Sequence, residues 1–427
     1  MKPETPDAKA TEPPSRQLVV FGCEQPPPPP LRLRAGPLTM LFEPDTVFLR
    51  RVCLGSTEVL RGIYAAVRDQ NWGTVPPRIS SFKSQISEAS FALSLDVECR
   101  QDEIHFRWHG AITGTADGTV KFSFDGEALT RFLRNRIGFC VLHPIRECAG
   151  VAARQPRTDG SVVEGRFPQT IEPQIVGQSS FRELRAVGHE VAPGLWAEVE
   201  LVGDVFEMED QRNWTDASFK TYCTPLAIPF PVEVPTGTRI RQEVTLRLIG
   251  PAAATEGRQI RVSSDAPTLE MPTQPSAALP KLGLGTAGDE PAPTTFANTH
   301  LSALRLAHLR ADVRLGEERW QPVLSEGIRQ AVALGLPLEL VVHLPAHGDG
   351  DLLELRRLLT DAGVRLASVL ALRQGEPAST ADTLRKVRQQ LEGIAVPIGG
   401  GTDAHFCELN REHALGRFGL ATADFVS

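Results

Sequence analysis

Apolar and polar residues alternate along much of the chain between residues 31 and 249. In the run from Thr119 to Phe124, Val120, Phe122 and Phe124 share one face and the polar residues between them share the other. This period of two predicts a β-strand with one buried face. The same pattern predicts strands over residues 91–99, 104–108, 195–202 and 240–248. We therefore predict an antiparallel β-sandwich over residues 31–250.

Asp-Gly pairs stand at both ends of that strand, at Asp117-Gly118 and Asp125-Gly126. Asp and Gly tolerate the positive φ angles that tight hairpin turns require. The sequence thus predicts a turn at each pair.

A different rhythm begins near residue 304. Strands are predicted over residues 304–313, 338–344, 366–372 and 396–401, with helices between them over residues 317–334, 352–362 and 380–391. A short strand over 281–285 precedes this series, and another begins at 424. Alternating strands and helices indicate a parallel sheet, either a doubly wound sheet or an eight-fold barrel. An eight-fold barrel takes about 250 residues, so we predict an incomplete α/β TIM-like barrel over residues 280–427.

Two segments of different composition bound these domains. Residues 1–30 are polar and end in five prolines, which predicts a disordered Pro-rich tail. Residues 251–279 are rich in Pro, Ala, Thr and Gly, which predicts a linker.

Composition restricts the location and the partners of the chain. The sequence has no run of about 20 apolar residues and no secretory signal. Its seven cysteines are scattered and form no CxxC pair, so we expect reduced thiols and a cytoplasmic protein. A net charge of −7 disfavours nucleic acid as a partner, and we expect no membrane association. The sequence does not determine the oligomeric state.

Polar residues are concentrated after the last complete predicted strand. Three glycines, at 399–401, are followed by a set of residues that we predict to lie at the carboxyl end of the sheet, where βα folds bind ligands: Asp403, His405, Glu408, Asn410 and Arg411. Alternatively, the glycines permit close packing and the polar residues cap a helix.

His308, Arg310 and Asp312 alternate along the earlier strand, so they share one face. Ionisable residues on a barrel-facing side are costly unless paired, which favours a polar substrate site. The alternative is an outward face beneath helices, with Arg310 and Asp312 simply paired.

Histidines at the end of the next strand, His343 and His347, raise the question of a metal site together with Asp403 and His405. The sequence has no HxH or HExxH spacing. We predict no metal ligands and no cofactor, and leave a divalent metal open.

Residues 131–144 and 206–220 of the β-rich part are dense in Arg, Asn, acid and aromatic residues. Such mixtures suit sugar binding, although structural ion pairs would produce the same composition. The chain has neither a GxSxG elbow nor a GxxxxGK[ST] loop.

Several long motifs together resemble the D-apionate lactonase family. They are LRLRAGPLTMLFEPDTVFLRRVCLG, RGIYAAVRDQNWGTVPP, FLRNRIGFCVLHP, FEMEDQRNWTDASFKTYCTPL, LRLAHLRADVRL and IGGGTDAHFCELNRE. The resemblance spans residues 31–427. It implies a β-rich domain, a TIM-like barrel and a small C-terminal domain, with hydrolysis of D-apionolactone to D-apionate in the breakdown of apiose. Against that pattern, we expect the chain to be truncated at its C-terminus, without the later barrel strands.

Lactone opening needs a base for water, a donor for the departing ring oxygen and charge stabilisation. We predict Glu408 as general base or acid and His405 or Asp403 as the second proton-handling group. Arg310 and Arg411 would bind hydroxyls or the oxyanion, with His308 and Asn410 completing a site for a small-molecule sugar lactone. Two other hypotheses are a glycoside hydrolase with paired carboxylates and a carbohydrate-binding protein without activity.

Overall fold

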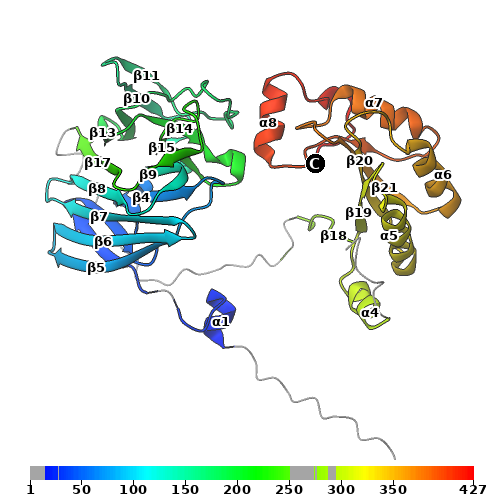
Figure 1. Cartoon of the computed structure of the whole chain (residues 1–427), viewed down its shortest axis with the longest axis horizontal. Coiled ribbons are helices and arrows are strands. Elements are labelled where there is room, and N and C mark those ends of the chain that lie inside the picture. Colours follow the sequence, from blue (N-terminus) through cyan, green and yellow to red (C-terminus); the bar gives the residue numbers. More distant parts are fainter. Residues whose placement is uncertain (1–14, 27, 251–273, 275–276, 287–294) are drawn as a thin grey trace, which may run out of the picture. The chain divides into compact units, whose positions relative to one another are not determined.

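The computed structural model describes residues 15–26, 28–250, 274, 277–286 and 295–427. They form two compact units, an N-terminal β unit and a C-terminal unit that includes every described residue from 274 on (Figure 1). No helix among these residues has the length and apolar character needed to cross a membrane.

The β unit consists of two antiparallel sheets, as the alternation predicted. The first has the order β1-β2-β3-β4-β9-β15-β14, with β16 paired to β9. Its strands are β1 (Leu31–Ala35), β2 (Leu38–Glu43), β3 (Phe48–Leu54), β4 (Thr57–Asp69), β9 (Phe132–Pro144), β14 (Phe206–Asp210), β15 (Ser218–Cys223) and β16 (Val232–Val234).

The second sheet has the order β11-β10-β12-β13-β17-β8-β7-β6-β5. Its strands are β5 (Pro77–Ile86), β6 (Phe91–Gln101), β7 (Ile104–Gly114), β8 (Val120–Ala128), β10 (Ala152–Pro156), β11 (Val162–Arg166), β12 (Ala186–Ala192), β13 (Leu195–Val202) and β17 (Arg239–Ile249). The predicted strands are confirmed, and most extend beyond their predicted ends. Phe106, Phe122, Phe124 and Phe139 from the two sheets form part of one apolar core.

The two Asp-Gly pairs have different structures. Asp117-Gly118 forms the predicted turn between β7 and β8, with Gly118 at φ 88°. The turn predicted at Asp125-Gly126 is wrong, because both residues lie within β8. A Cβ on Gly126 would come within 2.4 Å of the Phe106 ring, so this glycine makes room for a core side chain.

The C-terminal unit is a five-stranded parallel sheet in sequential order, β18-β19-β20-β21-β22. The strands are β18 (Gly283–Gly285), β19 (His308–Arg314), β20 (Leu338–Leu344), β21 (Leu366–Arg373) and β22 (Ile398–Gly399). A parallel bridge from Gly400 to Val426 continues the sheet near the end of the chain. The helices are α4 (Thr295–Ala303), α5 (Trp320–Leu334), α6 (Leu352–Ala362), α7 (Ala381–Gln390) and α8 (Phe406–Ala414).

One face of this sheet packs against the helices. Alternate strand residues such as Leu309, Val342 and Ala371 form an apolar core with Leu324 of α5 and Leu355 of α6. Helices α5 and α6 end at Gly335 and Gly363 in left-handed conformation, as expected for helix C-termini.

The segments outside the two domains agree less fully with prediction. Part of the predicted tail forms a short helix, α1 (Arg16–Phe21), which begins at Ser15 because the Ser15 hydroxyl accepts a hydrogen bond from the Leu18 N–H. Most of the predicted linker, residues 251–273 and 275–276, lies outside the described residues, as do residues 1–14. The strand predicted from residue 304 begins only at His308, after a turn in which Arg305 has φ 51°.

Candidate functional site

The side of the parallel sheet opposite the helices carries ionisable residues. Along β19, His308, Arg310 and Asp312 alternate with Leu309, Ala311 and Val313, which are buried against the helices. The predicted common face of the three ionisable residues is therefore confirmed. They do not form the surface that lies beneath the helices.

Glu339 is the centre of the first group of contacts on this polar face. It stands opposite Arg310 in the register of β19 and β20. Its carboxylate lies 3.8 Å from the Arg310 guanidinium and 4.0 Å from the His308 ring, and it accepts a hydrogen bond of 3.2 Å from the Ser368 hydroxyl. Glu339 therefore contacts both His308 and Arg310 within the sheet.

A second group lies at the carboxyl end of the strands. Arg310 donates two hydrogen bonds to Asp312, of 3.0 and 3.1 Å. The His343 ring lies between two carboxylates, with Nε2 3.7 Å from Asp312 Oδ1 and Nδ1 3.7 Å from Asp403 Oδ2. Arg314 Nη2 is 3.5 Å from the same Asp403 oxygen.

The charges of this group stabilise one another. His343 and Arg310 together hold the pKa of Asp312 well below its ordinary value, although partial burial opposes them. Asp312 in turn raises the pKa of Arg310. The site therefore holds a fixed negative charge beside the His343 ring, and cationic groups on either side of it.

A hollow of about 390 Å³ opens beside this group at the end of β19. It is lined by Asp312, Arg314, Glu317, Glu318, Arg319, Trp320 and Val323. Its volume is within the range of small-molecule sites, and its lining is strongly polar. Such a hollow suits a ligand rich in hydroxyl groups.

The three glycines after β21 are explained by close packing, which was the alternative interpretation of this motif. A Cβ on Gly399 would come within 2.5 Å of the Phe425 ring, and one on Gly401 within 2.0 Å of the Ser427 carbonyl oxygen. At Gly400, the Ser379 side chain would be 3.1 Å away. The glycines allow the chain after β22 to lie against residues 425–427.

The polar residues that follow the glycines do not all join one group. Asp403 is brought to His343 and Arg314, whereas His405 is the exposed residue that precedes α8. Glu408 forms a 2.6 Å ion pair with Arg411 one turn along α8. Asn410 is half-buried on the same helix. Within the C-terminal unit, Asp403 contacts Arg314 and His343 on the polar face of the sheet, whereas Glu408 pairs with Arg411 on α8.

Arg314 was not among the site residues predicted from the sequence, and His343 was predicted only as a possible metal ligand. The available signal was positional, because Arg314 continues the alternation of β19 and His343 stands opposite it on β20. His347 lies exposed in the loop after β20. Among the described residues, no three His, Cys, Asp or Glu side chains are grouped as metal ligands would be.

The polar clusters of the β unit are built largely from internal contacts. Arg136 donates to the carbonyl oxygens of Thr224, Pro225 and Ile228. The Tyr222 hydroxyl donates a 2.6 Å bond to Glu207, and Asp210 forms an ion pair with Arg212. These contacts fit the structural interpretation of the individual residues.

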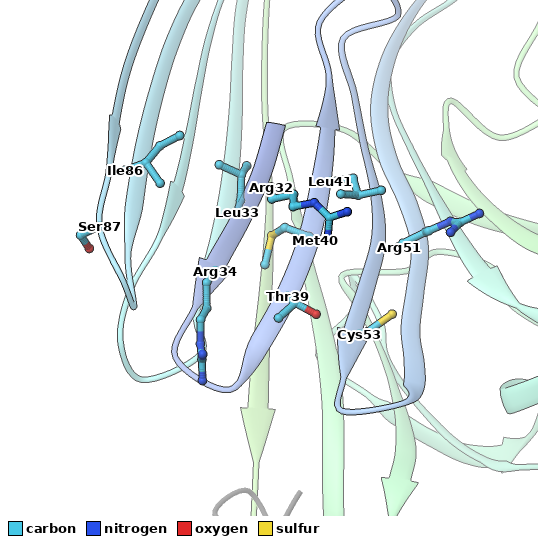
Figure 2. A pocket seen from close by; sticks show the side chains of 10 residues that line it. All are labelled: Arg32, Leu33, Arg34, Thr39, Met40, Leu41, Arg51, Cys53, Ile86 and Ser87. Carbon is cyan, nitrogen blue, oxygen red and sulfur yellow. The ribbon is translucent and has the colours of Figure 1, made fainter. Parts of the chain in front are cut away.

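A separate hollow of about 380 Å³ lies on the first sheet, over β1 to β3 and the end of β5 (Figure 2). Arg32, Arg34 and Arg51 are among its lining residues. Their side chains point in different directions, and Arg34 donates to the Gly36 carbonyl oxygen. Because the three guanidinium groups do not converge, we do not take this hollow as the functional site.

Comparisons with known proteins connect this geometry to a family. A family model for the D-apionate lactonase N-terminal domain matches residues 18–251, and one for the D-apionate lactonase TIM barrel domain matches residues 282–427. A D-apionate lactonase from Brucella anthropi is 35% identical over 232 residues, which are 54% of this chain and 37% of that protein.

Two solved structures are distantly similar to this chain. Galactose 1-epimerase from Lactobacillus acidophilus NCFM has 6% identity and a TM-score of 0.32, over 50% of this chain and 92% of that chain. A beta-arabinopyranosidase has 10% identity and a TM-score of 0.35, over 89% and 68%. Similarities this low support no further inference about the chain. The two family models together, by contrast, match nearly the whole chain from residue 18 onward, so the chain belongs to the D-apionate lactonase family.

Proposed function

We propose that this protein hydrolyses the lactone ring of D-apionolactone to give D-apionate, in the catabolism of apiose. The observation that supports the proposal most strongly is the group at the carboxyl end of the parallel strands, where Asp312, His343, Asp403 and two arginines lie beside a polar hollow. Family membership supports the choice of reaction.

Lactone opening has three chemical requirements, and each has a candidate group in the chain. Asp403 is a carboxylate with 59% of its side chain exposed, so it can accept a proton from an attacking water molecule. Glu408, which the sequence predicted as general base or acid, is the alternative to Asp403 in this role, and His405 is a further proton-handling candidate. Arg310, Arg314 and Arg411 supply positive charge for an oxyanion or for the carboxylate product.

The remaining polar residues would bind the substrate. His308 and Asn410 are proposed to contact hydroxyl groups of a small sugar lactone. No step of this scheme uses a cofactor. A divalent metal remains an open alternative that a chelator tests directly.

The proposed location is the cytoplasm. Five of the seven cysteines are buried, and they are scattered over both units. Reduced thiols are typical of a reducing compartment.

A proton-release assay at constant pH tests the proposal. Purified chain is mixed with D-apionolactone or with a simple sugar lactone, with and without EDTA, and the Brucella anthropi lactonase serves as the positive control. We expect acid release from D-apionolactone above the spontaneous rate, unchanged by EDTA. Release of free sugar from an apiose glycoside, without lactone hydrolysis, would instead indicate a glycoside hydrolase.

A further inference from the structure

We infer that His343 is a proton-relay residue, which holds a proton behind Asp403 and is positioned by Asp312. The inference rests on the proposed lactone hydrolysis and deepens it, because it assigns a proton-handling role to a side chain that the sequence suggested only as a metal ligand. It makes His343 a residue that acts through Asp403 rather than one that touches the substrate.

The first observation is the position of the ring. His343 is the last but one residue of β20, and only 5% of its side chain is exposed. Its Nε2 is buried and has no hydrogen-bond partner. Leaving a buried polar atom unpaired lowers the stability of the folded chain, and an apolar residue at this position would avoid that loss. The distances of 3.7 Å to both carboxylates are longer than a direct hydrogen bond, so a proton passes between Asp403 and the ring only when this gap closes by a few tenths of an ångström or more.

The second observation is the difference between the two carboxylates. Both oxygens of Asp312 accept hydrogen bonds from Arg310, so Asp312 is fixed in position and in charge. Asp403 is held less firmly, by Arg314 at 3.5 Å, and it is the more exposed of the two. One carboxylate is thus suited to orient the imidazole and the other to meet a reactant.

The remaining neighbours of His343 are consistent with this division. Leu372 stands opposite it on β21 and is apolar. The other acid on this face of β20, Glu339, is already in contact with His308, Arg310 and Ser368. The charged groups that face the His343 ring are therefore Asp312 and Asp403, with Arg310 and Arg314 behind them.

The proton can be followed through one turnover. Water attacks the lactone carbonyl carbon, a C–O bond forms, and Asp403 takes the proton of the water and passes it to His343. The imidazolium is stabilised between two carboxylates. When the tetrahedral intermediate collapses, the bond to the ring oxygen breaks and the proton returns through Asp403 to that oxygen. The hydroxy acid product then ionises and releases one proton to solvent.

The test is a comparison of His343→Gln with His347→Gln in the full chain, using D-apionolactone as substrate. Glutamine keeps the polarity of histidine but does not titrate. For His343→Gln we expect kcat to fall by about 100-fold or more, with KM changed by less than about threefold, and the dependence of kcat on pH to differ from that of the wild type. His347→Gln, on the exposed loop after the same strand, retains the wild-type rate and profile.

An Asp312→Asn variant keeps the test decisive if His343→Gln does not fold. This change removes one of the two carboxylate charges beside the His343 ring, so the dependence of kcat on pH should change. A purely structural role for Asp312 would change the stability or the rate without changing that pH dependence. Wild-type rate and pH profile in His343→Gln, or a wild-type pH profile in a folded Asp312→Asn chain, overturns the inference.

A binding experiment separates this inference from the proposed function. In ¹⁵N-histidine spectra of the wild-type chain, D-apionate is added as the probe, and the His347→Gln spectrum identifies the signals of the control residue. The His343 signal is the one that is missing from the His343→Gln spectrum. If no lactone is hydrolysed but this signal shifts when D-apionate is added, the proposed function fails and the assignment of His343 to the site stands. If that histidine does not respond, the inference fails as well.

Discussion

Both units bury histidines, but the surroundings of those histidines are opposite in kind. In the β unit His143 and His189 are fully buried, with ring centroids 6.1 Å apart, beside Phe167. Burial lowers the pKa of both, that of His189 to about 4. In the C-terminal unit His343 is almost as deeply buried, yet it lies between two carboxylates. Burial among apolar side chains makes a histidine a neutral core residue, whereas His343 has carboxylates on both sides of its ring.

The charged faces of the two kinds of sheet differ in the same way. In the sandwich, charged residues on the outer face form separate cross-strand pairs such as Lys121 with Glu243 and Arg247 with Glu200. In the parallel sheet, charged residues of neighbouring strands form one connected group that extends from Glu339 to Asp403 through Arg310, Asp312 and His343. Isolated pairs stabilise little, and a connected group beside a hollow can carry out chemistry.

The largest expected effect is that of Asp403→Asn on turnover. Asparagine has nearly the same shape but cannot accept the proton, so kcat for D-apionolactone should fall by about 100- to 1,000-fold while the chain stays folded. The matched variant is Glu408→Gln, which should also lower kcat, but by less, because Glu408 is paired with Arg411 on α8. Steady-state kinetics and circular dichroism measure both properties. Wild-type turnover in Asp403→Asn would remove this carboxylate from the mechanism.

Gly126→Ala should have the next largest effect, on the stability of the sandwich. The added methyl group would meet the Phe106 ring at 2.4 Å, and overpacking of this kind costs up to about 3 kcal/mol. Gly165→Ala in β11 is the control, since its nearest contact would be at 3.9 Å. Urea unfolding of the two variants gives the comparison. Equal stabilities would mean that the core around Phe106 relaxes freely.

The buried histidines predict that stability falls on the acid side of neutrality. Because the folded-state pKa of His189 lies below the ordinary value, the unfolded chain binds a proton more readily. The stabilisation is complete above about pH 6.5 and is lost as the pH falls toward 4. His189 alone should account for about 2 kcal/mol between pH 7 and pH 5. Urea unfolding at both pH values should show this slope in the wild type and a smaller one in His189→Leu.

The smallest expected effect is that of Lys121→Met on the outer face of the sandwich. The side chains of Lys121 and Glu243 are 48% and 33% exposed. Exposed pairs contribute about 0–1 kcal/mol, and salt screens them. Thermal unfolding at low and high salt should show a difference within that range. A larger loss would mean that the outer face of the sandwich is more strongly coupled than its exposure indicates.

The sequence predicted most elements of the fold, but it predicted the site only in part. The alternation that defined β6, β8 and β19 follows directly from which residues are apolar, so strands and faces could be assigned. The prediction of a turn at Asp125-Gly126 was wrong. A glycine can serve a turn or make room for an aromatic ring beside a strand, and only the tertiary contact with Phe106 shows which of these two roles Gly126 has. The helix α8 was considered only as something the polar residues might cap, because glycine and polar residues dominate the segment before it.

The sequence by itself determined the two domain types and the family resemblance, because these depend on local periodicity and on long continuous motifs. Only the tertiary structure decided which polar residues meet. Asp312, His343 and Asp403 are separated by 31 and 60 positions in the chain and come together because parallel strands end at the same edge of a sheet. Neither the spacing of these residues nor the composition predicts that they meet at this edge, because the edge forms only when the strands pair and the helices connect them in parallel.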